Sequence, residues 1–350
     1  MKTTPQNLYA ITVAVLFSLV LTSPPVFGQT DFTTDPVGLI DLTVSGGSAA
    51  SPKLSLVSPT LTKPILWQGV ITGISGTTIT VGGTPWTASQ FNGAAGSHYV
   101  EIISTTTPAR SGTLADITAT TTSAITTFPA TGAAIGDSIK IRKDVTISDL
   151  FGATNSAGLL ASDDPTTADE VLIYIGATAT SYFYYTGAPG YPAGWYNSGS
   201  FDPAGSISIA PNEAVVIKRK TSGNLSITFA GAVKTGNTLL PIQNGLNVLG
   251  TASAKGMTLF NSGLNTGSST TGVLASDDPT TADEILLYSN GSATSYFYYN
   301  GGAPGYPNGW YESGGFTDAN NIPIAPGTAF VLKRKNGIPF NWALPSPTSF

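Results

Sequence analysis

The chain has 350 residues, only 10% of them charged, and a formal net charge of −5 at pH 7. Soluble domains usually carry about 25% charged residues. A weakly acidic chain lacks the basic surface that nucleic-acid-binding proteins use, so we expect no nucleic-acid partner. The chain has no cysteine, which excludes disulfides, thiolate metal sites and cysteine nucleophiles.

Residues 1–28 have the pattern of a cleaved secretory signal. Lys2 precedes an apolar run from Leu8 to Leu21, and small residues stand near Gly28. A basic start, a short apolar run and a small-residue cleavage site are typical of export signals. A membrane anchor is the alternative, but it needs roughly 20 apolar residues. We therefore expect cleavage near Gly28, a protein that is secreted or on the outer cell surface, and no membrane span after cleavage.

The segment 29–142 predicts a small N-terminal β domain. Residues 70–81 alternate between apolar and polar and are interrupted at Ser75-Gly76, which predicts a hairpin with a tight turn. The segment 139–143 alternates apolar and basic residues, as a half-buried strand does. The single histidine, His98, stands in a Gly-rich stretch where we expect a loop. A Ser-His-acid catalytic arrangement would depend entirely on this residue.

An aromatic-rich segment then occurs twice. Residues 159–185 return as 273–299 with 20 of 27 positions identical, and the likeness continues to basic ends at 218–220 and 333–335. Solenoid and propeller repeats run about 20–50 residues. The period of 114 residues, 115 after one inserted Gly, indicates repetition of a whole domain or of half a double-sized one. We place the two copies at 143–238 and 239–350.

Short strands separated by Gly and Pro turns are expected in each copy. In the first copy they span 170–175, 179–185, 207–209 and 215–219. This spacing predicts antiparallel sandwiches. The predicted fold class is all-β, with a small N-terminal β domain followed by two duplicated antiparallel β-sandwich (jelly-roll-like) modules. The basic ends, and the basic residues of 140–143, are expected to be solvated strand faces that protect an exposed edge.

Three features together resemble a known family. They are Thr34-Asp35-Pro36-Val37-Gly38, the 69–81 hairpin followed by Trp86, and the doubled unit of acidic pair, Tyr-Phe-Tyr-Tyr strand, Gly-Trp and basic strand. Over essentially its whole mature length the chain resembles a family of uncharacterised secreted all-β proteins from Verrucomicrobia-like bacteria. The resemblance implies secretion and the fold class, and no established activity.

The repeated aromatic residues are the first candidates for a ligand site. On one strand, Tyr182 and Tyr184 face one way and Phe183 and Tyr185 the other. Exposed rings with polar tips can stack on sugars, whereas large aromatic rings are more often core residues. The candidate ligand-binding residues are Tyr184, Tyr191, Trp195, Tyr196, Tyr298, Tyr306, Trp310 and Tyr311.

Four carboxylates within eight residues of each copy are the second candidate. Calcium binds six to eight oxygens, but the spacing is not that of an EF-hand, and Asp-Pro sequences also form ordinary turns. No other cofactor is expected. The candidate calcium ligands are Asp163, Asp164, Asp169, Glu170, Asp277, Asp278, Asp283 and Glu284.

These patterns predict a secreted or cell-surface structural or adhesive protein without catalytic activity. The alternative is a carbohydrate-binding protein that uses the duplicated Tyr/Trp clusters, and a two-carboxylate hydrolase comes third. The structural hypothesis predicts that Trp195 and Trp310 are buried, and the carbohydrate hypothesis that they are exposed in matching grooves. The hydrolase hypothesis requires paired carboxylates in a cleft near His98 or in one copy only. Expected partners are surface or extracellular polysaccharide, or self-association.

Overall fold

The structure, a computed structural model, describes residues 35–345 except 93–96, 105–106 and 176–177. Across these residues the regular structure comprises 24 strands, one α-helix (α1, Ile147–Phe151) and one 3-10 turn (Pro108–Arg110). The predicted all-β fold class is therefore confirmed. The predicted signal lies outside the described residues. Within the described part, we find no helix with the length and apolar character needed to cross a membrane.

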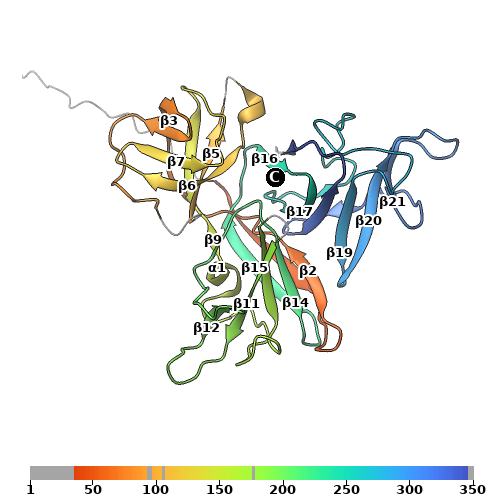
Figure 1. Cartoon of the computed structure of the whole chain (residues 1–350), viewed down its shortest axis with the longest axis horizontal. Coiled ribbons are helices and arrows are strands. Elements are labelled where there is room, and N and C mark those ends of the chain that lie inside the picture. Colours follow the sequence, from red (N-terminus) through yellow and green to blue (C-terminus); the bar gives the residue numbers. More distant parts are fainter. Residues whose placement is uncertain (1–34, 93–96, 105–106, 176–177, 346–350) are drawn as a thin grey trace, which may run out of the picture. The chain divides into compact units, whose positions relative to one another are not determined.

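Six strands of the N-terminal region close into a barrel in the order β3-β4-β7-β6-β5-β8 (Figure 1). The predicted hairpin is present as β3 and β4, with its turn one residue later than expected, at Gly76-Thr77. Alternate apolar residues such as Ile79 and Ile139 fill the barrel interior together with Trp86. The strands are β3 (Ile65–Ser75), β4 (Thr78–Val81), β5 (His98–Ile103), β6 (Leu114–Thr120), β7 (Ala124–Phe128) and β8 (Ser138–Lys143).

The two strands that precede the barrel do not belong to it. β1 (Val37–Val44) pairs with β15 (Leu225–Ala232), and β2 (Lys53–Val57) pairs with β14 (Val215–Arg219). Figure 1 shows orange β2 alongside green β14. The segment predicted as one N-terminal domain, 29–142, is thus divided between the barrel and the first repeat. Period-2 alternation predicts a strand but does not identify its partner, which here lies far along the chain.

The repeats share one strand arrangement. A five-stranded sheet has the order β12-β11-β10-β14-β2 in the first repeat and β21-β20-β19-β23-β17 in the second. The two-stranded sheets β1-β15 and β9-β13 correspond to β16-β24 and β18-β22. The first repeat also contains β9 (Val145–Thr146), β10 (Glu170–Ile175), β11 (Thr178–Tyr185), β12 (Gly194–Asn197) and β13 (Ser208–Ile209). The second contains β16 (Thr238–Ile242), β17 (Gly245–Gly250), β18 (Met257–Thr258), β19 (Glu284–Ser289), β20 (Ser292–Tyr299), β21 (Gly309–Glu312), β22 (Pro323–Ile324), β23 (Ala329–Arg334) and β24 (Phe340–Leu344).

This correspondence shows where the barrel stands in the chain. The first repeat begins at β1, is interrupted by the barrel between β2 and β9, and ends at β15. The second repeat runs without interruption from β16 to β24. The predicted boundary at 238/239 falls within one residue of the start of β16.

Each five-stranded sheet is buried on both faces near its centre. Val215 and Ile217 of β14 point into the core of the first repeat, whereas Val216 points to the other face. There it packs in a cluster shared with Ala329 and Val331 of β23. Burial on both faces explains why these strands are continuously apolar instead of alternating. The repeats therefore contact each other through the faces of their sheets.

Candidate functional site

The two tryptophans that follow the aromatic strands are core residues. The side chains of Trp195 and Trp310 are 3% and 1% exposed. Trp195 Nε1 donates a hydrogen bond to the Gly152 carbonyl at 2.8 Å. Tyr184 and Tyr298 lie edge-on to these rings, with centroids 5.3 and 5.5 Å apart. Among the described residues, neither indole therefore lies exposed in a groove.

On the opposite sheet face, each repeat has a smaller aromatic cluster. The predicted division of the Tyr-Phe-Tyr-Tyr strand is confirmed, because Phe183 and Tyr185 point to this face with Tyr196. Tyr191 lies at its edge and is 55% exposed. Its counterpart, Tyr306, is 45% exposed. Of the eight aromatic candidates, these two present the most ring surface to solvent, since Tyr196 and Tyr311 are buried and Tyr184 and Tyr298 half-buried.

Phe201 and Phe316 complete these clusters and were not among the candidates. Phe201 stacks on Tyr196 with centroids 4.8 Å apart, and Phe316 stacks on Tyr311 at 4.9 Å. Both have left-handed backbones, with φ of 62° and 53°. Such a conformation costs on the order of 1–3 kcal/mol and persists only where surrounding contacts fix it. The sequence could have identified both residues, because they recur at equivalent positions in two Gly-rich loops.

The acidic loop of the first repeat contains carboxylates that hydrogen-bond to, or pair with, other groups of the same chain. Buried Asp169 accepts the N–H groups of Leu160 at 2.8 Å and Lys220 at 2.7 Å. Its Oδ2 also lies 3.0 Å from Nε of Arg219, an ion pair whose alignment falls short of a hydrogen bond. Asp164 accepts the N–H and hydroxyl of Thr166, and these bonds lower the pKa of its carboxyl.

The second repeat reproduces the arrangement with a better-satisfied arginine. Asp283 accepts the N–H groups of Leu274 at 2.8 Å and Lys335 at 2.6 Å. Arg334 donates to Asp283 at 2.5 Å and to the Gly272 carbonyl at 2.8 Å. It also donates to the carbonyls of Ser269 and Ile338.

The remaining glutamates of these loops pair with the basic strand ends. Burial raises the pKa of Glu170, but hydrogen bonds from Lys220 and Lys218 outweigh burial and lower it. Glu284 lies 3.5 Å from Lys333 and accepts a hydrogen bond from Ser295. In the described part of the chain, no group of three or more Asp, Glu or His residues is arranged to hold a metal ion. At these carboxylates the geometry shows capped turns and ion pairs.

The basic ends also differ from the sequence prediction. Arg219 and Arg334 are buried, and β14 and β23 each lie between two other strands, so neither is an edge. In the barrel, Arg142 is 1% exposed and pairs with Asp35. The prediction of solvated faces was therefore wrong for these three arginines. The acidic loops and basic strands, interpreted separately in the sequence, are each other's partners.

A cavity of about 510 Å³ lies beside the loop that follows β20. Tyr298 lines it, and the Trp310 indole packs edge-on against the Tyr298 ring. Asn300 and Asn308 stand where the first repeat has Thr186 and Ala193, so the amide lining belongs to the second repeat. The lining residues are Asn265, Gly267, Ser269, Val273, Leu274, Ala275, Tyr298, Asn300 and Asn308.

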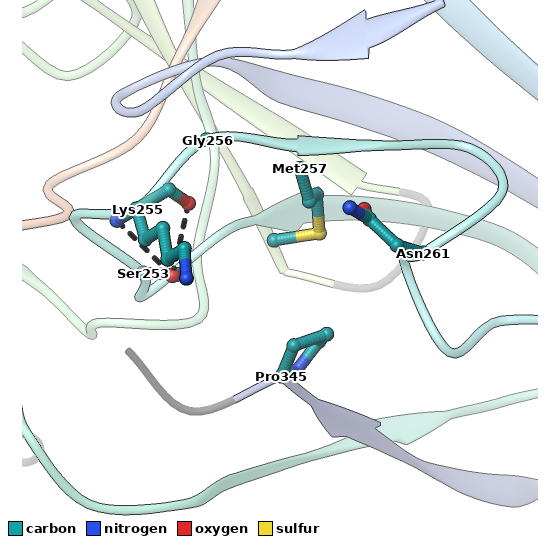
Figure 2. A pocket seen from close by; sticks show the side chains of 6 residues that line it. All are labelled: Ser253, Lys255, Gly256, Met257, Asn261 and Pro345. Carbon is teal, nitrogen blue, oxygen red and sulfur yellow. Dashed lines mark hydrogen bonds between the residues drawn. The ribbon is translucent and has the colours of Figure 1, made fainter. Parts of the chain in front are cut away.

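A smaller cavity of about 120 Å³ lies next to Met257 in the same repeat, as Figure 2 shows. Ser253 and Lys255 hydrogen-bond to each other there, through the serine hydroxyl and the lysine backbone. Neither a carboxylate nor an aromatic ring is among its six lining residues. We assign it no ligand.

His98 is the first residue of β5 and not the loop residue that was expected. Its Nδ1 lies 2.9 Å from the Ser97 hydroxyl, and its ring packs 5.5 Å from Phe91. Burial and the nearby charge of Lys143 lower its pKa. No ion pair or hydrogen bond found in the described segments joins it to a carboxylate.

The chain was also compared with known proteins. No family model, no curated protein and no solved structure matches it. Function must therefore be argued from the geometry of this molecule.

Proposed function

We propose that this chain is an exported structural or adhesive protein of the cell surface or its surroundings, without catalytic activity. The observation that carries the proposal is the burial of Trp195 and Trp310 inside two equivalent β units. Large aromatic residues buried in this way contribute strongly to core packing, as expected of a scaffold. The signal-like residues 1–28 support export.

We also infer that the repeats arose by duplication of a nine-stranded unit. Identity at 20 of 27 aligned positions supports this inference. So does the match of nine described strands, β1, β2 and β9–β15, with β16–β24. On this view the barrel was inserted into the first unit. Two equivalent surfaces held in one chain suit a protein that bridges or lines other material.

Tryptophan fluorescence of the mature chain, residues 29–350, tests the proposal. We expect blue-shifted emission that acrylamide quenches weakly, with no change on adding soluble glycans or on exchanging calcium for EDTA. Beads coated with the folded chain should be retained on cell-surface material, and beads coated with heat-unfolded chain should not. A saturable glycan-dependent shift in emission, or equal retention of both kinds of bead, would contradict the proposal.

A second candidate function is binding of a neutral carbohydrate in the 510 Å³ cavity of the second repeat. Three asparagines, a serine and Tyr298 line it. Side-chain amides both donate and accept hydrogen bonds, as sugar hydroxyls do, and the lining has no charged side chain. Of the predicted aromatic residues, this candidate site uses Tyr298. Its polar contacts with a sugar would come from asparagine side chains and not from the tryptophans.

The first repeat supplies the matched variant for this site. Asn300→Thr combined with Asn308→Ala gives the second repeat the residues that the first already carries. We expect affinity for neutral oligosaccharides, measured by isothermal titration calorimetry, to fall about tenfold or more, since each lost hydrogen bond contributes about 0.5–1.5 kcal/mol. Unfolding should be unchanged. Tyr191→Ala in the other repeat is the control, and equal affinity in both variants would exclude the cavity as the binding site.

A further inference from the structure

A third cavity, of about 180 Å³, is formed where the barrel meets both repeats. Tyr99 and Asp116 line it from the barrel strands β5 and β6. Glu213 lines it from the turn that precedes β14. The rest of the lining is largely apolar and comes from Leu114, Ala115, Phe128, Pro129, Ala210, Pro211, Leu239 and Pro241, with Asn212.

Within the described segments, the carboxylates around this cavity have no cationic partner. The ion pairs formed among the described residues include neither Asp116 nor Glu213, nor Asp144, which interacts electrostatically with both. Elsewhere in the barrel a buried carboxylate is paired, because Lys234 lies 2.7 Å from Glu101. The cavity therefore carries carboxylates without a positively charged partner among the described residues, whereas other buried carboxylates of the fold, such as Glu101, have one.

Two buried polar groups at this place are also unsatisfied. In the part of the chain that the structure describes, the hydroxyl of Tyr99 (2% exposed) has no hydrogen-bond partner, and neither carboxylate oxygen of Asp144 (1% exposed) has one. The great majority of buried polar atoms in proteins have at least one partner. Because Tyr99 lines the cavity, an occupant that donates hydrogen bonds would satisfy it.

Burial of these acids affects their protonation. Burial raises the pKa of Asp144 to about 9, with further contributions from Asp116 and Glu213. Burial also raises the pKa of Glu213 to about 7, although a hydrogen bond from the Ala210 N–H opposes it. A carboxyl whose pKa is higher in the folded state binds its proton more tightly there. Its contribution to stability is present at low pH and is lost as pH rises through the folded pKa.

We therefore predict that Asp144→Asn changes the pH dependence of stability. Between about pH 5 and 9, Asp144 should make the wild-type free energy of unfolding fall steadily as pH rises. The asparagine variant should lose most of this slope, leaving the smaller part from Glu213 and Asp116. Urea unfolding at pH 5, 7 and 9 measures it. Parallel curves for the two proteins would contradict the prediction.

Two features select the kind of occupant. The walls formed by Pro211, Leu239 and Pro241 suit an aliphatic chain. An ammonium group has three donors for the carboxylate and hydroxyl acceptors. A bare metal ion is disfavoured, since no three suitable ligands gather among the described residues.

We propose that this cavity binds a primary alkylammonium group, either of a free amine or of a lysine side chain, through Asp116, Glu213 and the Tyr99 hydroxyl. The aliphatic part of the ligand lies against the proline and leucine walls. The glutamate itself is not repeated, because strand register places Thr328 of the second repeat at the position of Glu213. Binding is strongest where the carboxylates are ionised, so affinity rises with pH.

The test uses the mature chain with n-butylammonium chloride as the probe, and potassium chloride at equal ionic strength and 1-butanol as controls. A ligand at concentration L that binds only the folded state raises the free energy of unfolding by RT ln(1 + L/Kd), so the unfolding midpoint rises with the logarithm of ligand concentration once the site is largely filled. We expect butylammonium to raise the midpoint above both controls, and by more at pH 8 than at pH 5. No difference from potassium chloride and butanol at pH 8 would overturn the proposal without any variant being made.

Matched variants locate the site. Glu213→Thr introduces the residue that the second repeat carries at this turn, and Asp116→Asn keeps the shape of the side chain. Each should weaken butylammonium binding about tenfold or more, since hydrogen bonds to charged groups contribute about 1.5–3 kcal/mol. Asp163→Asn, which changes an exposed carboxylate outside the cavity, should leave binding unchanged. An equal loss of butylammonium affinity in Asp163→Asn would show that the effect comes from the overall charge of the protein, and it would overturn the proposed site.

Comparison of butylamine with N-acetyl-lysine methylamide distinguishes the two sources of the ammonium group. Tighter binding of the lysine derivative supports a partner protein that inserts a lysine, and tighter binding of butylamine supports a soluble amine. Calorimetry in buffers of different ionisation enthalpy should show proton release when either probe binds near pH 7. Binding of both probes without proton release, and with equal affinity in Glu213→Thr, would contradict the proposal.

Discussion

Replacing Arg334 with methionine is expected to destabilise the fold by about 3–5 kcal/mol, the typical cost of removing one partner of a buried ion pair. Arg334 and Asp283 are both fully buried. Without the guanidinium, Asp283 keeps only its two backbone donors, and the carbonyls of Gly272, Ser269 and Ile338 lose a donor. Urea unfolding at pH 7 measures the loss.

The first repeat provides the internal control for this prediction. Arg219→Met removes the equivalent cation, but Arg219 is less well satisfied, because its Nη1 has no hydrogen-bond partner among the described residues. Loss of Arg219 should therefore cost clearly less than loss of Arg334. Equal losses, or a loss below about 1 kcal/mol for Arg334→Met, would mean that the loops are held by their backbone turns and not by these pairs.

Trp310→Ala is expected to destabilise the second repeat by about 3–5 kcal/mol, because truncation of a fully buried aromatic side chain leaves a cavity. The ring of Tyr298 would also lose its edge-on contact with the indole. Tyr306→Ala, in the loop that precedes β21 and 45% exposed, should change stability by about 0.5 kcal/mol or less. Chemical unfolding of both variants compares the two positions directly.

Comparing these two variants also shows whether a predicted aromatic residue stabilises the fold or contacts a ligand. If Trp310→Ala were as stable as the wild type and lost affinity for a glycan, the tryptophan would be a contact residue and the scaffold proposal would be wrong. A stability loss in Trp195→Ala similar to that in Trp310→Ala is expected, because both indoles occupy the same place in their repeats.

Local patterns in the sequence predicted several of the strands. Alternation of apolar residues predicted the 70–81 hairpin, the strand at 139–143 and the opposite facing of Tyr182 and Phe183, all of which the structure contains. These features depend on neighbours in the chain, where the period-2 geometry of a strand leaves a direct mark.

Features that depend on distant partners were not predicted. β2 and β17 occupy equivalent places, yet Lys53–Val57 and Gly245–Leu249 share a single identical residue, so the repeat cannot be traced there by sequence. Asp169 and Arg219 were assigned to a turn and a solvated face because nothing in their separate segments shows that they meet. The acidic cavity was missed for the same reason, since Asp116 and Glu213 come from different bodies of the fold.

The position of the barrel between β2 and β9 has a consequence for how the chain folds. β1 and β2 pair with β15 and β14, so the first repeat cannot complete its sheets until almost all of its residues, and the barrel, are available. Contacts between residues far apart in sequence slow folding. During synthesis, the edges of β1 and β2 stay unpaired until β14 and β15 have been made, and unpaired strand edges promote association with other chains. The uninterrupted second repeat has no such delay, although it emerges last.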